Sequence, residues 1–426
     1  MRSPMTQTTP TSGSALAPLS GVRVLEIGSY LAGPFCATQL ADLGAEVIKL
    51  EDPKSGDHMR DYGPFISGES SSFMRTNRNK KSLAVDLKSE EGRKLAIDLV
   101  PGADILVENM RPGAMKRLGL DYETLRNINP RLIYVAASGW GQDGALSHLA
   151  GLDIMAQARS GIMSVTGQPD REPAKAGVPL CDVTCAIYAA LGAVAALRAR
   201  ELTGEGQMVD VSLFETGVSF AQWEAGRYFA NGEVPKRSGS AHNTSAPYQA
   251  FRSADGWFTL GAPNLRAWQA LCRVLRRDDL LRDERFSDEN ARFANRSVLA
   301  REIESTTKCR VTAEWIGELQ EAGVACSPIH DYSQVFADEA LEQRSFFWDA
   351  PHPTAGKVRQ LASPMRLSRT PTRRDRAGPL LGEHTEEIVR ELGRSDAQLK
   401  KLIDSGVIRI AEAPVKAAKA RRGAAR

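Results

Sequence analysis

Asp182 is the residue whose type and setting first suggest chemistry. It ends the stretch Lys175-Ala-Gly-Val-Pro-Leu-Cys-Asp182 and stands just before a long apolar segment. A free carboxyl group has a pKa of about 3.9, so at neutral pH it is ionised and can attack a carbonyl carbon without a general base. A helix N-terminus would favour the anion further. Aspartate is also a common helix cap, and on these residues alone the cap is the stronger interpretation.

The cysteines offer a second chemistry, metal binding. Cys181 and Cys185 are four residues apart and could share one face of a helix. No second Cys or His pair at a zinc-like spacing accompanies them, so we expect no metal site. The six cysteines are scattered through the chain, which indicates a reduced, cytoplasmic protein rather than a disulfide framework.

Basic residues gather at two places. Arg78, Lys80 and Lys81 form one cluster, while Arg111 and Arg117 follow Asn109 in the other. Such groups suit the phosphates of an anionic ligand, although a solvated charged face is an equally good interpretation of any one of them. A net charge of +3 on 426 residues argues against a nucleic-acid partner.

The segment Gly28-Ser-Tyr-Leu-Ala-Gly33 stands where the fingerprint of a dinucleotide-binding site would lie. The fingerprint of such a site requires a glycine where Tyr30 stands, so that a pyrophosphate can approach the backbone. Glu51 ends the next apolar run, where a ribose-binding acid would lie, but an acid often ends a strand. The sequence therefore argues against an NAD-dependent dehydrogenase.

The elements that must position these residues alternate between strand and helix. Val22–Ile27 and Ala45–Leu50 predict buried strands on either side of a helix over Pro34–Leu43. This βαβ pattern implies an α/β fold with a Rossmann-like parallel sheet. The pattern continues with strands over Ala103–Val107, Leu132–Ala137 and Gln207–Leu213, and with helices over Ser89–Val100, Thr184–Glu201 and Phe214–Phe229.

The pattern of alternating strands and helices changes beyond residue 230, which predicts more than one domain. Residues 231–247 lack periodicity and are typical of a linker. We therefore expect a disordered tail (1–20), a large domain (21–230), a small α+β domain (248–340), a return linker with the C-terminal part of the large domain (341–410), and a disordered basic tail (411–426). The longest apolar run, Ala186–Leu197, is about half the ~20 residues of a membrane span, so we expect a buried helix and no membrane association.

Nine segments, taken in order, resemble the family III CoA-transferases, also called CaiB/BaiF proteins, which include formyl-CoA transferase. They are Leu31-Ala-Gly-Pro-Phe-Cys, Leu40-Ala-Asp-Leu-Gly-Ala-Glu-Val-Ile-Lys, Gly56-Asp-His-Met-Arg, Asn77-Arg-Asn-Lys-Lys-Ser, Val107-Glu-Asn-Met-Arg-Pro-Gly, Ser138-Gly-Trp-Gly-Gln-Asp-Gly, Asp153-Ile-Met-Ala-Gln-Ala, Thr203-Gly-Glu-Gly-Gln and Leu381-Gly-Glu-His-Thr. The resemblance runs from about Gly21 to Leu402.

The resemblance implies an enzyme that moves CoA from an acyl-CoA donor to a free carboxylic acid through an aspartyl-CoA intermediate on Asp182. It implies no tightly bound cofactor, with CoA and acyl-CoA as substrates, and an interlocked homodimer. It places Tyr30 and Leu31 near the pantetheine arm and Trp140 near the acyl group. By the same resemblance, the CoA pocket is lined by Arg78, Lys80, Lys81, Asn109, Arg111 and Arg117.

Departures from the family pattern bear on specificity. Related α-methylacyl-CoA racemases have a histidine where this chain has Leu152, which cannot exchange a proton. The glycine-rich loop of formyl-CoA transferase corresponds to Arg237–Pro247, which holds only Gly239. The N-terminal half is more similar to relatives that use succinyl-CoA and a dicarboxylic acid. A racemase-like isomerase and a non-catalytic CoA-binding protein remain the alternatives.

Overall fold

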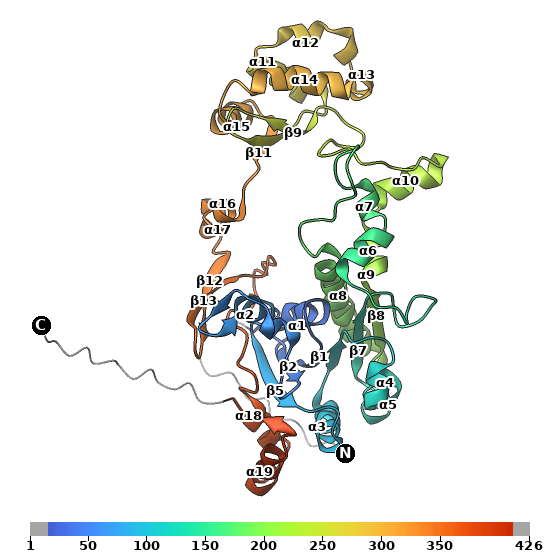
Figure 1. Cartoon of the computed structure of the whole chain (residues 1–426), viewed down its shortest axis with the longest axis vertical. Coiled ribbons are helices and arrows are strands. Elements are labelled where there is room, and N and C mark those ends of the chain that lie inside the picture. The colour runs from blue at the N-terminus through green and yellow to red at the C-terminus, as the bar shows by residue number, and fades with distance from the viewer. Residues whose placement is uncertain (1–15, 412–426) are drawn as a thin grey trace, which may run out of the picture. The chain divides into compact units, whose positions relative to one another are not determined.

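The computed structural model describes residues 16–411, which divide into two compact units (Figure 1). The first unit runs to Ser160 and also includes Val178–Phe220 and the chain from Glu342 onward. The second comprises Gly161–Gly177 and Ala221–Leu341. Both predicted tails lie largely outside the described residues. Within the N-terminal one, Ala17 and Leu19 are buried.

A seven-stranded sheet organises the first unit, in the order β14-β5-β2-β1-β6-β7-β8. In this order, the six strands β5, β2, β1, β6, β7 and β8 each pair in parallel with the next, and β14 pairs antiparallel with β5. The strands are β1 (Arg23–Ile27), β2 (Glu46–Glu51), β5 (Lys80–Val85), β6 (Ile105–Glu108), β7 (Ile133–Ser138), β8 (Met208–Ser212) and β14 (Ile408–Arg409). The predicted α/β fold with a large parallel sheet is confirmed.

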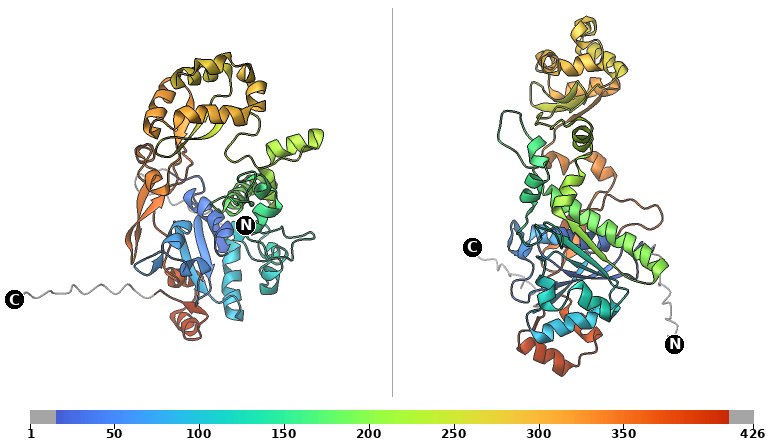
Figure 2. Two further views of the ribbon diagram at one scale, coloured as in Figure 1. Left: turned by 45° about the horizontal axis from the view of Figure 1, so that its top comes forward. Right: turned by 90° about the vertical axis from the view of Figure 1, so that its right-hand side faces the viewer.

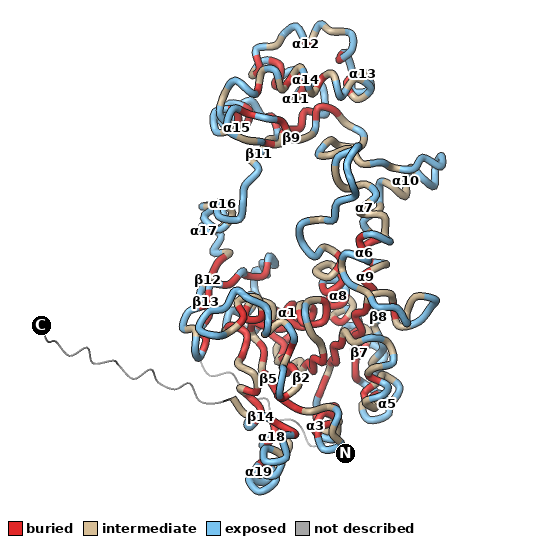
Figure 3. The backbone as a smooth tube through the Cα atoms, in the orientation of Figure 1, coloured by how far each residue is buried: buried red, intermediate tan, exposed pale blue. Residues whose placement is uncertain are grey.

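Successive apolar side chains of these strands point to opposite faces of the sheet, and helices cover both faces. Leu25 and Leu106 point into one core with α3, α5 and α18, whereas Val24 and Ile105 point into the other with α1 and α8. Because helices cover both of its faces, the sheet is buried, and its strands form the red centre of this unit in Figure 3. The helices are α1 (Ala32–Asp42), α2 (Ser71–Thr76), α3 (Glu90–Leu99), α4 (Ala114–Leu118), α5 (Tyr122–Ile128), α6 (Asp153–Arg159), α8 (Leu180–Thr203), α9 (Leu213–Ser219), α18 (Thr385–Glu391) and α19 (Asp396–Asp404).

The long helix α8 lies along the sheet against β7, β8 and α1 (Figure 2). Within residues 16–411 it is the one helix long and apolar enough to cross a membrane. Its inner face is a row of buried small side chains, among them Ala186, Ala189 and Ala193, which pack on α1 and the sheet. We therefore interpret α8 as the core helix that the sequence predicts.

Two short hairpins complete the first unit. The pairs are β3 (Phe65–Ile66) with β4 (Glu69–Ser70), and β12 (Phe347–His352) with β13 (Gly356–Leu361). A short 3-10 helix, η1 (His58–Asp61), follows the turn after β2. The second hairpin packs on α2 through Met74, Ala350 and Val358, so the C-terminal part of the chain returns to the first unit.

The second unit has its own core around Trp268, Phe258 and Leu319. Its three-stranded sheet has the order β11-β10-β9 and is antiparallel throughout. The strands are β9 (Tyr248–Arg252), β10 (Trp257–Gly261) and β11 (Ala325–Pro328). The helices are α7 (Ile162–Val165), α10 (Gln222–Asn231), α11 (Leu265–Leu275), α12 (Asp278–Arg282), α13 (Glu289–Ala294), α14 (Arg296–Thr307), α15 (Thr312–Glu321) and α16 (Tyr332–Val335), and α17 (Glu339–Gln343) spans the boundary.

Candidate active site

The turn after β1 is held by Asn109, which follows the end of β6. The side-chain amide of Asn109 makes two hydrogen bonds to the backbone of Ser29: Oδ1 accepts from the N–H and Nδ2 donates to the carbonyl, both at 2.9 Å. A Cβ atom on Gly28 would lie 2.5 Å from Asn109 Oδ1, so any larger residue there would displace the Asn109 amide. Asn109, predicted as a CoA contact, thus positions the turn that carries Tyr30 and Leu31.

Asp57 holds the other side of the same turn. Its Oδ1 accepts hydrogen bonds from Ser29 Oγ at 2.6 Å and from the Tyr30 N–H at 3.0 Å. Tyr30 has a left-handed backbone (φ 65°), a conformation that costs energy for a residue with a side chain. Burial opposes ionisation of Asp57, but Lys49 and these hydrogen bonds prevail and lower its pKa to about 2. A fixed anion therefore anchors a strained turn.

A chain of buried charges continues from Asp57 into the sheet. Lys49 Nζ lies 2.8 Å from Asp57 Oδ2 and 2.6 Å from Glu26 Oε1, and Lys80 Nζ lies 2.7 Å from Glu26 Oε2. All four side chains are fully buried. Lys80 also donates to the Pro34 carbonyl at 2.7 Å and to Asn77 Oδ1 at 2.9 Å. The ammonium group of Lys80, predicted to contact CoA, is thus bonded within the protein.

The two other residues of that cluster are likewise paired. Arg78 donates from Nε and Nη2 to the buried carboxylate of Asp42. Lys81 lies 2.8 Å from Glu46 and 2.7 Å from Glu387. Arg78, Lys80 and Lys81 therefore all form ion pairs within the protein, at the start of β5 and just before it. Their contact with CoA stays a prediction. Arg111 and Arg117, by contrast, are exposed around α4.

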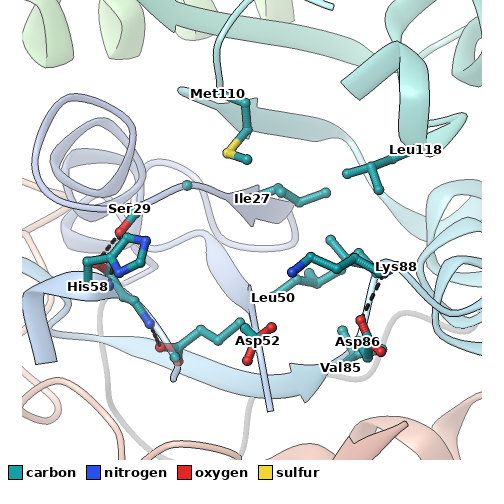
Figure 4. Close-up of a pocket in the computed structure, with 15 residues that line it drawn as sticks. Ile27, Ser29, Leu50, Asp52, His58, Val85, Asp86, Lys88, Met110 and Leu118 are labelled. Carbon is teal, nitrogen blue, oxygen red and sulfur yellow. Dashed lines mark hydrogen bonds between the residues drawn. The ribbon is translucent and has the colours of Figure 1, made fainter. Parts of the chain in front are cut away.

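A pocket of about 210 Å³ opens at the carboxyl ends of β1, β2 and β5 (Figure 4). Ile27, Leu50, Val85, Met110 and Leu118 give it apolar walls, and Asp52, His58 and Lys88 give it polar ones. Strand order reverses at β1, which lies between β2 and β6. Doubly wound sheets bind ligands in the crevice at such a switch point, outside the carboxyl ends of the strands.

Lys88 is the cation of this pocket that sequence reasoning missed. Its side chain is exposed and extends into the pocket in Figure 4. It comes three residues after the last residue of β5, Val85, and the sequence pattern does not predict that strand. A prediction of β5 would have placed Lys88 at the ligand-binding edge.

Glu51 does not serve as a ribose-binding acid. Arg60 donates to both of its carboxylate oxygens at 2.8 Å, and Ser82 Oγ donates to Oε1 at 2.7 Å. With the Asp57 N–H on Oε2 at 3.0 Å, the acceptors of this buried carboxylate are used within the protein. This agrees with the argument against an NAD site.

Asp182 lies inside the first turn of α8 and does not cap it. The helix begins at Leu180 with Pro179 as its N-cap, and no side chain of its own caps it. Instead Asp153, the first residue of α6, accepts from the N–H of Cys181 at 2.8 Å and from that of Asp182 at 3.3 Å. The cap interpretation of Asp182 is therefore wrong, because Asp153 supplies the cap.

The electrostatic setting of Asp182 also differs from the expectation. Burial, and then the neighbouring Asp153, raise the pKa of Asp182 to about 7. A pKa of about 7 leaves the carboxyl group about half-ionised at neutral pH, and two N–H groups at the start of the helix bond to Asp153 instead. A half-buried carboxylate with little stabilisation is a stronger nucleophile than one held by several donors.

The first turns of α1 and α8 lie at the same end of the sheet. Each helix follows a parallel strand, β1 or β7, and leads to the next, so each begins at the carboxyl ends of the strands. The two helices pack side by side on one face. Cys36 in the second turn of α1 and Ala186 in the second turn of α8 belong to the same buried cluster, so these two turns lie in one core. Asp182 and the turn of Tyr30 and Leu31 therefore share one edge of the molecule.

Trp140 lies in the loop that connects β7 to α6. Its Nε1 donates to the Ala150 carbonyl at 3.2 Å, and its ring centre is 5.7 Å from that of Phe214. The guanidinium carbon of Arg159 lies 5.9 Å from the Trp140 ring centre and 5.8 Å from that of Phe214. Trp140 thus belongs to an aromatic cluster around the carboxyl end of β7, while its contact with an acyl group stays a prediction.

Comparison with known proteins decides the family. Residues 19–385 match CoA-transferase family III. This chain belongs to that family. It is 36% identical over 396 residues to succinyl-CoA:glutarate CoA-transferase of Mus musculus, covering 92% of this chain and 91% of the other. It is 37% identical over 385 residues to succinyl-CoA:mesaconate CoA-transferase of Haloarcula hispanica, covering 88% and 96%.

A solved structure of the same kind supports the fold. A CAIB/BAIF family protein from Brucella suis superimposes with a TM-score of 0.81 at 39% identity, covering 88% of this chain and 100% of the other. This family III CoA-transferase is therefore an enzyme that takes CoA thioesters as substrates. Among residues 16–411, no group of three or more His, Cys, Asp or Glu side chains is arranged to hold a metal ion.

Proposed function

We propose that this enzyme transfers CoA through a covalent intermediate on Asp182. The observation that carries the proposal is the half-buried carboxyl group of Asp182 in the first turn of α8, beside Asp153 and with its pKa raised to about 7. A group that is half-ionised at neutral pH, and poorly stabilised when ionised, is suited to attack a thioester. Its place at the carboxyl edge of the sheet puts it on the side where the pocket opens.

Each step exchanges one acyl bond for another. The Asp182 carboxylate attacks the thioester carbon, the C–S bond breaks, and CoA leaves as the thiolate, which gives an acyl-aspartyl anhydride. The thiolate then attacks the aspartyl carbon and releases the donor acid as its carboxylate, which leaves aspartyl-CoA. The acceptor carboxylate attacks that thioester, and the expelled thiolate attacks the acceptor's acyl carbon, so acyl-CoA and the Asp182 carboxylate form.

Retention of the thiolate between steps accounts for much of the expected rate. A reactant held in place makes the second attack effectively unimolecular, and such positioning contributes on the order of 7–11 kcal/mol. Each tetrahedral intermediate carries an oxyanion that requires donors. The first turn of α1, at Ala32 and Gly33, presents backbone N–H groups at the same edge, and we assign them this role.

The pocket at β1, β2 and β5 suits the nucleotide end of CoA. Its apolar walls, including Leu50, Val85 and Leu118, match a purine ring, and the ammonium group of Lys88 matches a phosphate. The turn of Tyr30 and Leu31, which lies between this pocket and α1, would then adjoin the pantetheine arm. Lys88 takes the phosphate-binding role in this proposal because Arg78, Lys80 and Lys81 are paired within the protein.

We propose succinyl-CoA as the donor and a dicarboxylic acid as the acceptor. The relatives of Mus musculus and Haloarcula hispanica are named for succinyl-CoA with glutarate and with mesaconate, and each covers most of both chains. The exposed Arg159 over the Trp140 ring offers a cation for a distal carboxylate near α6. A screen of acyl-CoA donors against mono- and dicarboxylic acids, read by mass spectrometry, tests this; a preference for monocarboxylic acids would contradict it.

We also propose that the enzyme works as an interlocked homodimer. The outer face of α8 carries the exposed apolar side chains Ile187, Tyr188 and Leu191, spaced one helical turn or less apart. A second copy of the chain that covers this face would remove the patch from water. Sedimentation at decreasing concentration tests the assembly, and a stable folded monomer would rule it out.

Chemical trapping tests the proposed covalent intermediate. Hydroxylamine added during turnover cleaves an aspartyl-CoA thioester and leaves a hydroxamate on the protein, which mass spectrometry places in the sequence. We expect the label at Asp182, no label in Asp182→Asn, and normal labelling in the exposed control Asp143→Asn. Product formation without label at Asp182 would overturn the assignment.

A further inference from the structure

The start of α8 depends on a residue of another helix. Pro179 cannot cap the helix with its side chain, and of the first N–H groups of α8 that of Leu180 donates to the Val178 carbonyl at 2.8 Å, which leaves the next two in need of an acceptor. Oδ1 of Asp153 accepts from two of them, on Cys181 and Asp182. Asp153 is itself the first residue of α6, so its carboxylate ties the beginning of α8 to that of α6.

The orientation of the Asp153 carboxylate is fixed from its other side. Nε2 of Gln157, one turn further along α6, donates to Asp153 Oδ2 at 2.6 Å, and Gln157 is fully buried. Close packing of α9 reinforces this arrangement: a Cβ on Gly217 would lie 2.6 Å from Ser160 Oγ and 3.2 Å from Cys181 Sγ. Because α6, α8 and α9 pack closely, the Asp153 carboxylate is held in place beside Asp182.

Among residues 16–411, the groups that shift the pKa of Asp182 include no cation. On α6 the negative neighbour is Asp153, and on α8 the titratable neighbours are the thiols of Cys181 and Cys185. From β8, Asp210 acts on Cys185, and on α9, Glu215 accepts from Ser212. The Arg159 guanidinium of α6 lies over aromatic rings instead. The raised pKa of Asp182, about 7, agrees with this inventory.

We propose that Asp153 is the positioning residue of the nucleophile: it occupies the N–H groups at the start of α8 and opposes the charge of Asp182 with its own. The inference rests on the proposed role of Asp182. A carboxylate deprived of donors and placed beside a second carboxylate is a destabilised reactant. When Asp182 bonds to the acyl carbon and the C–S bond breaks, the negative charge passes to the CoA thiolate. The repulsion from Asp153 is then relieved, which favours the anhydride.

The variant Asp153→Asn separates charge from capping. Asparagine retains an oxygen that accepts the two N–H groups but carries no charge. We expect the acidic limb of kcat/KM against pH to move down by about one unit, because Asp182 ionises more easily. At pH 8 we expect kcat to fall about tenfold or more, with KM for acyl-CoA unchanged, because the stabilised carboxylate is a weaker nucleophile. Asp153→Glu keeps the charge and should keep the limb near its original position.

Asp121→Asn is the matched control. Asp121 caps α5 through the Thr124 N–H, as Asp153 caps α8, but it is in a different helix of the unit. Asparagine caps about as well as aspartate, so we expect the melting temperature to change little and the pH profile to stay in place. If the acidic limb also stays in place in Asp153→Asn, Asp153 is a structural cap only and the proposal fails.

A direct measurement covers the case in which Asp153→Asn does not fold. Infrared difference spectra between the wild type and Asp182→Asn report the protonation of Asp182 from pH 4 to 9. Titration near pH 7 supports the proposal, and titration near the ordinary value of an aspartate, about 3.9, overturns it. Hydroxylamine labelling at Asp182 tests the nucleophile separately, so failure of the positioning role and failure of the proposed function give different results.

Discussion

Lys49 and Asp57 form an ion pair of 2.8 Å, with both side chains fully buried. The pair joins a central strand of the sheet to the turn that carries Tyr30, because Asp57 also binds the backbone of that turn. A carboxylate with three donors and a buried cation thus replaces the glycine-rich turn of a dinucleotide site. The ligand-binding edge is consequently positioned by charges in the core.

Asp57→Asn tests this anchoring. The substitution leaves the buried ammonium of Lys49 with less compensation, and breaking a buried pair costs about 3–5 kcal/mol. We expect the free energy of unfolding in urea to fall by roughly that amount and the Kd for CoA to rise. The control Asp404→Asn removes an exposed pair with Lys400 and should change stability by less than about 1 kcal/mol. Equal effects of the two variants would contradict the anchoring role.

Gly28→Ala tests the contact between the turn and Asn109. The added methyl group would lie 2.5 Å from Asn109 Oδ1 and displace the amide from Ser29. We expect a loss of about 1–3 kcal/mol in stability and weaker CoA binding, measured by denaturation and calorimetry. Gly226 in α10 has nothing within 4 Å of such a methyl group, so Gly226→Ala should be neutral or slightly stabilising.

Asp182→Asn is expected to stabilise the fold in a pH-dependent way. The folded pKa of Asp182, about 7, lies above the unfolded value of about 3.9, so the native state binds more protons in that window and loses stability as pH rises through it. Asparagine removes this penalty. We expect a gain of about 1–3 kcal/mol at pH 8 and little gain at pH 4, measured by thermal unfolding. A gain independent of pH would point to packing instead.

Lys88→Ala tests the phosphate-binding role in the pocket. Loss of a cation that contacts a phosphate should raise KM for acyl-CoA about tenfold while kcat changes little, because Lys88 lies away from Asp182 in the proposed mode. A pantetheine thioester without phosphates should show no difference between the variant and the wild type. Lys94→Ala, which removes an exposed lysine of α3, serves as the control. The same loss with the pantetheine thioester would exclude a phosphate contact.

The sequence predicts the frame of the fold because strong periodicity decides its elements. The strands predicted over Val22–Ile27 and Ala45–Leu50 and the helix predicted over Pro34–Leu43 correspond to β1, β2 and α1. The helix predicted over Ser89–Val100 is α3, which Ser89 caps by accepting from the Gly92 N–H. The helical segment Phe214–Phe229 instead separates into α9 and α10, with Phe220 and Ala221 between them.

The strand β5 escaped prediction because it begins with two lysines. A pair of charged residues indicates a solvated face, yet Lys80 is fully buried through its bonds to Glu26 and Asn77. Only a partner distant in sequence makes that burial favourable, and no local pattern reports it. The same reason hid the role of Asp153, which acts on α8 from 28 residues away.

The candidate nucleophile was found by resemblance, and its environment required the structure. The long apolar helix was predicted to begin at Thr184 but begins at Leu180. Those four extra residues move Asp182 from the cap into the first turn. Its raised pKa comes from burial in that position and from the neighbouring carboxylate of Asp153, neither of which the sequence reports.

The edge of the main sheet is completed by the last described strand of the chain. Ile408 and Arg409 of β14 pair with Val85 and Ala84 of β5, more than 300 residues earlier, as the partner numbers show. During synthesis the β5 edge therefore stays open until Ile408 and Arg409 have left the ribosome, and an open strand edge invites association with other chains. Fragments that end before β14 should aggregate on expression, even when they include every residue of the candidate active site.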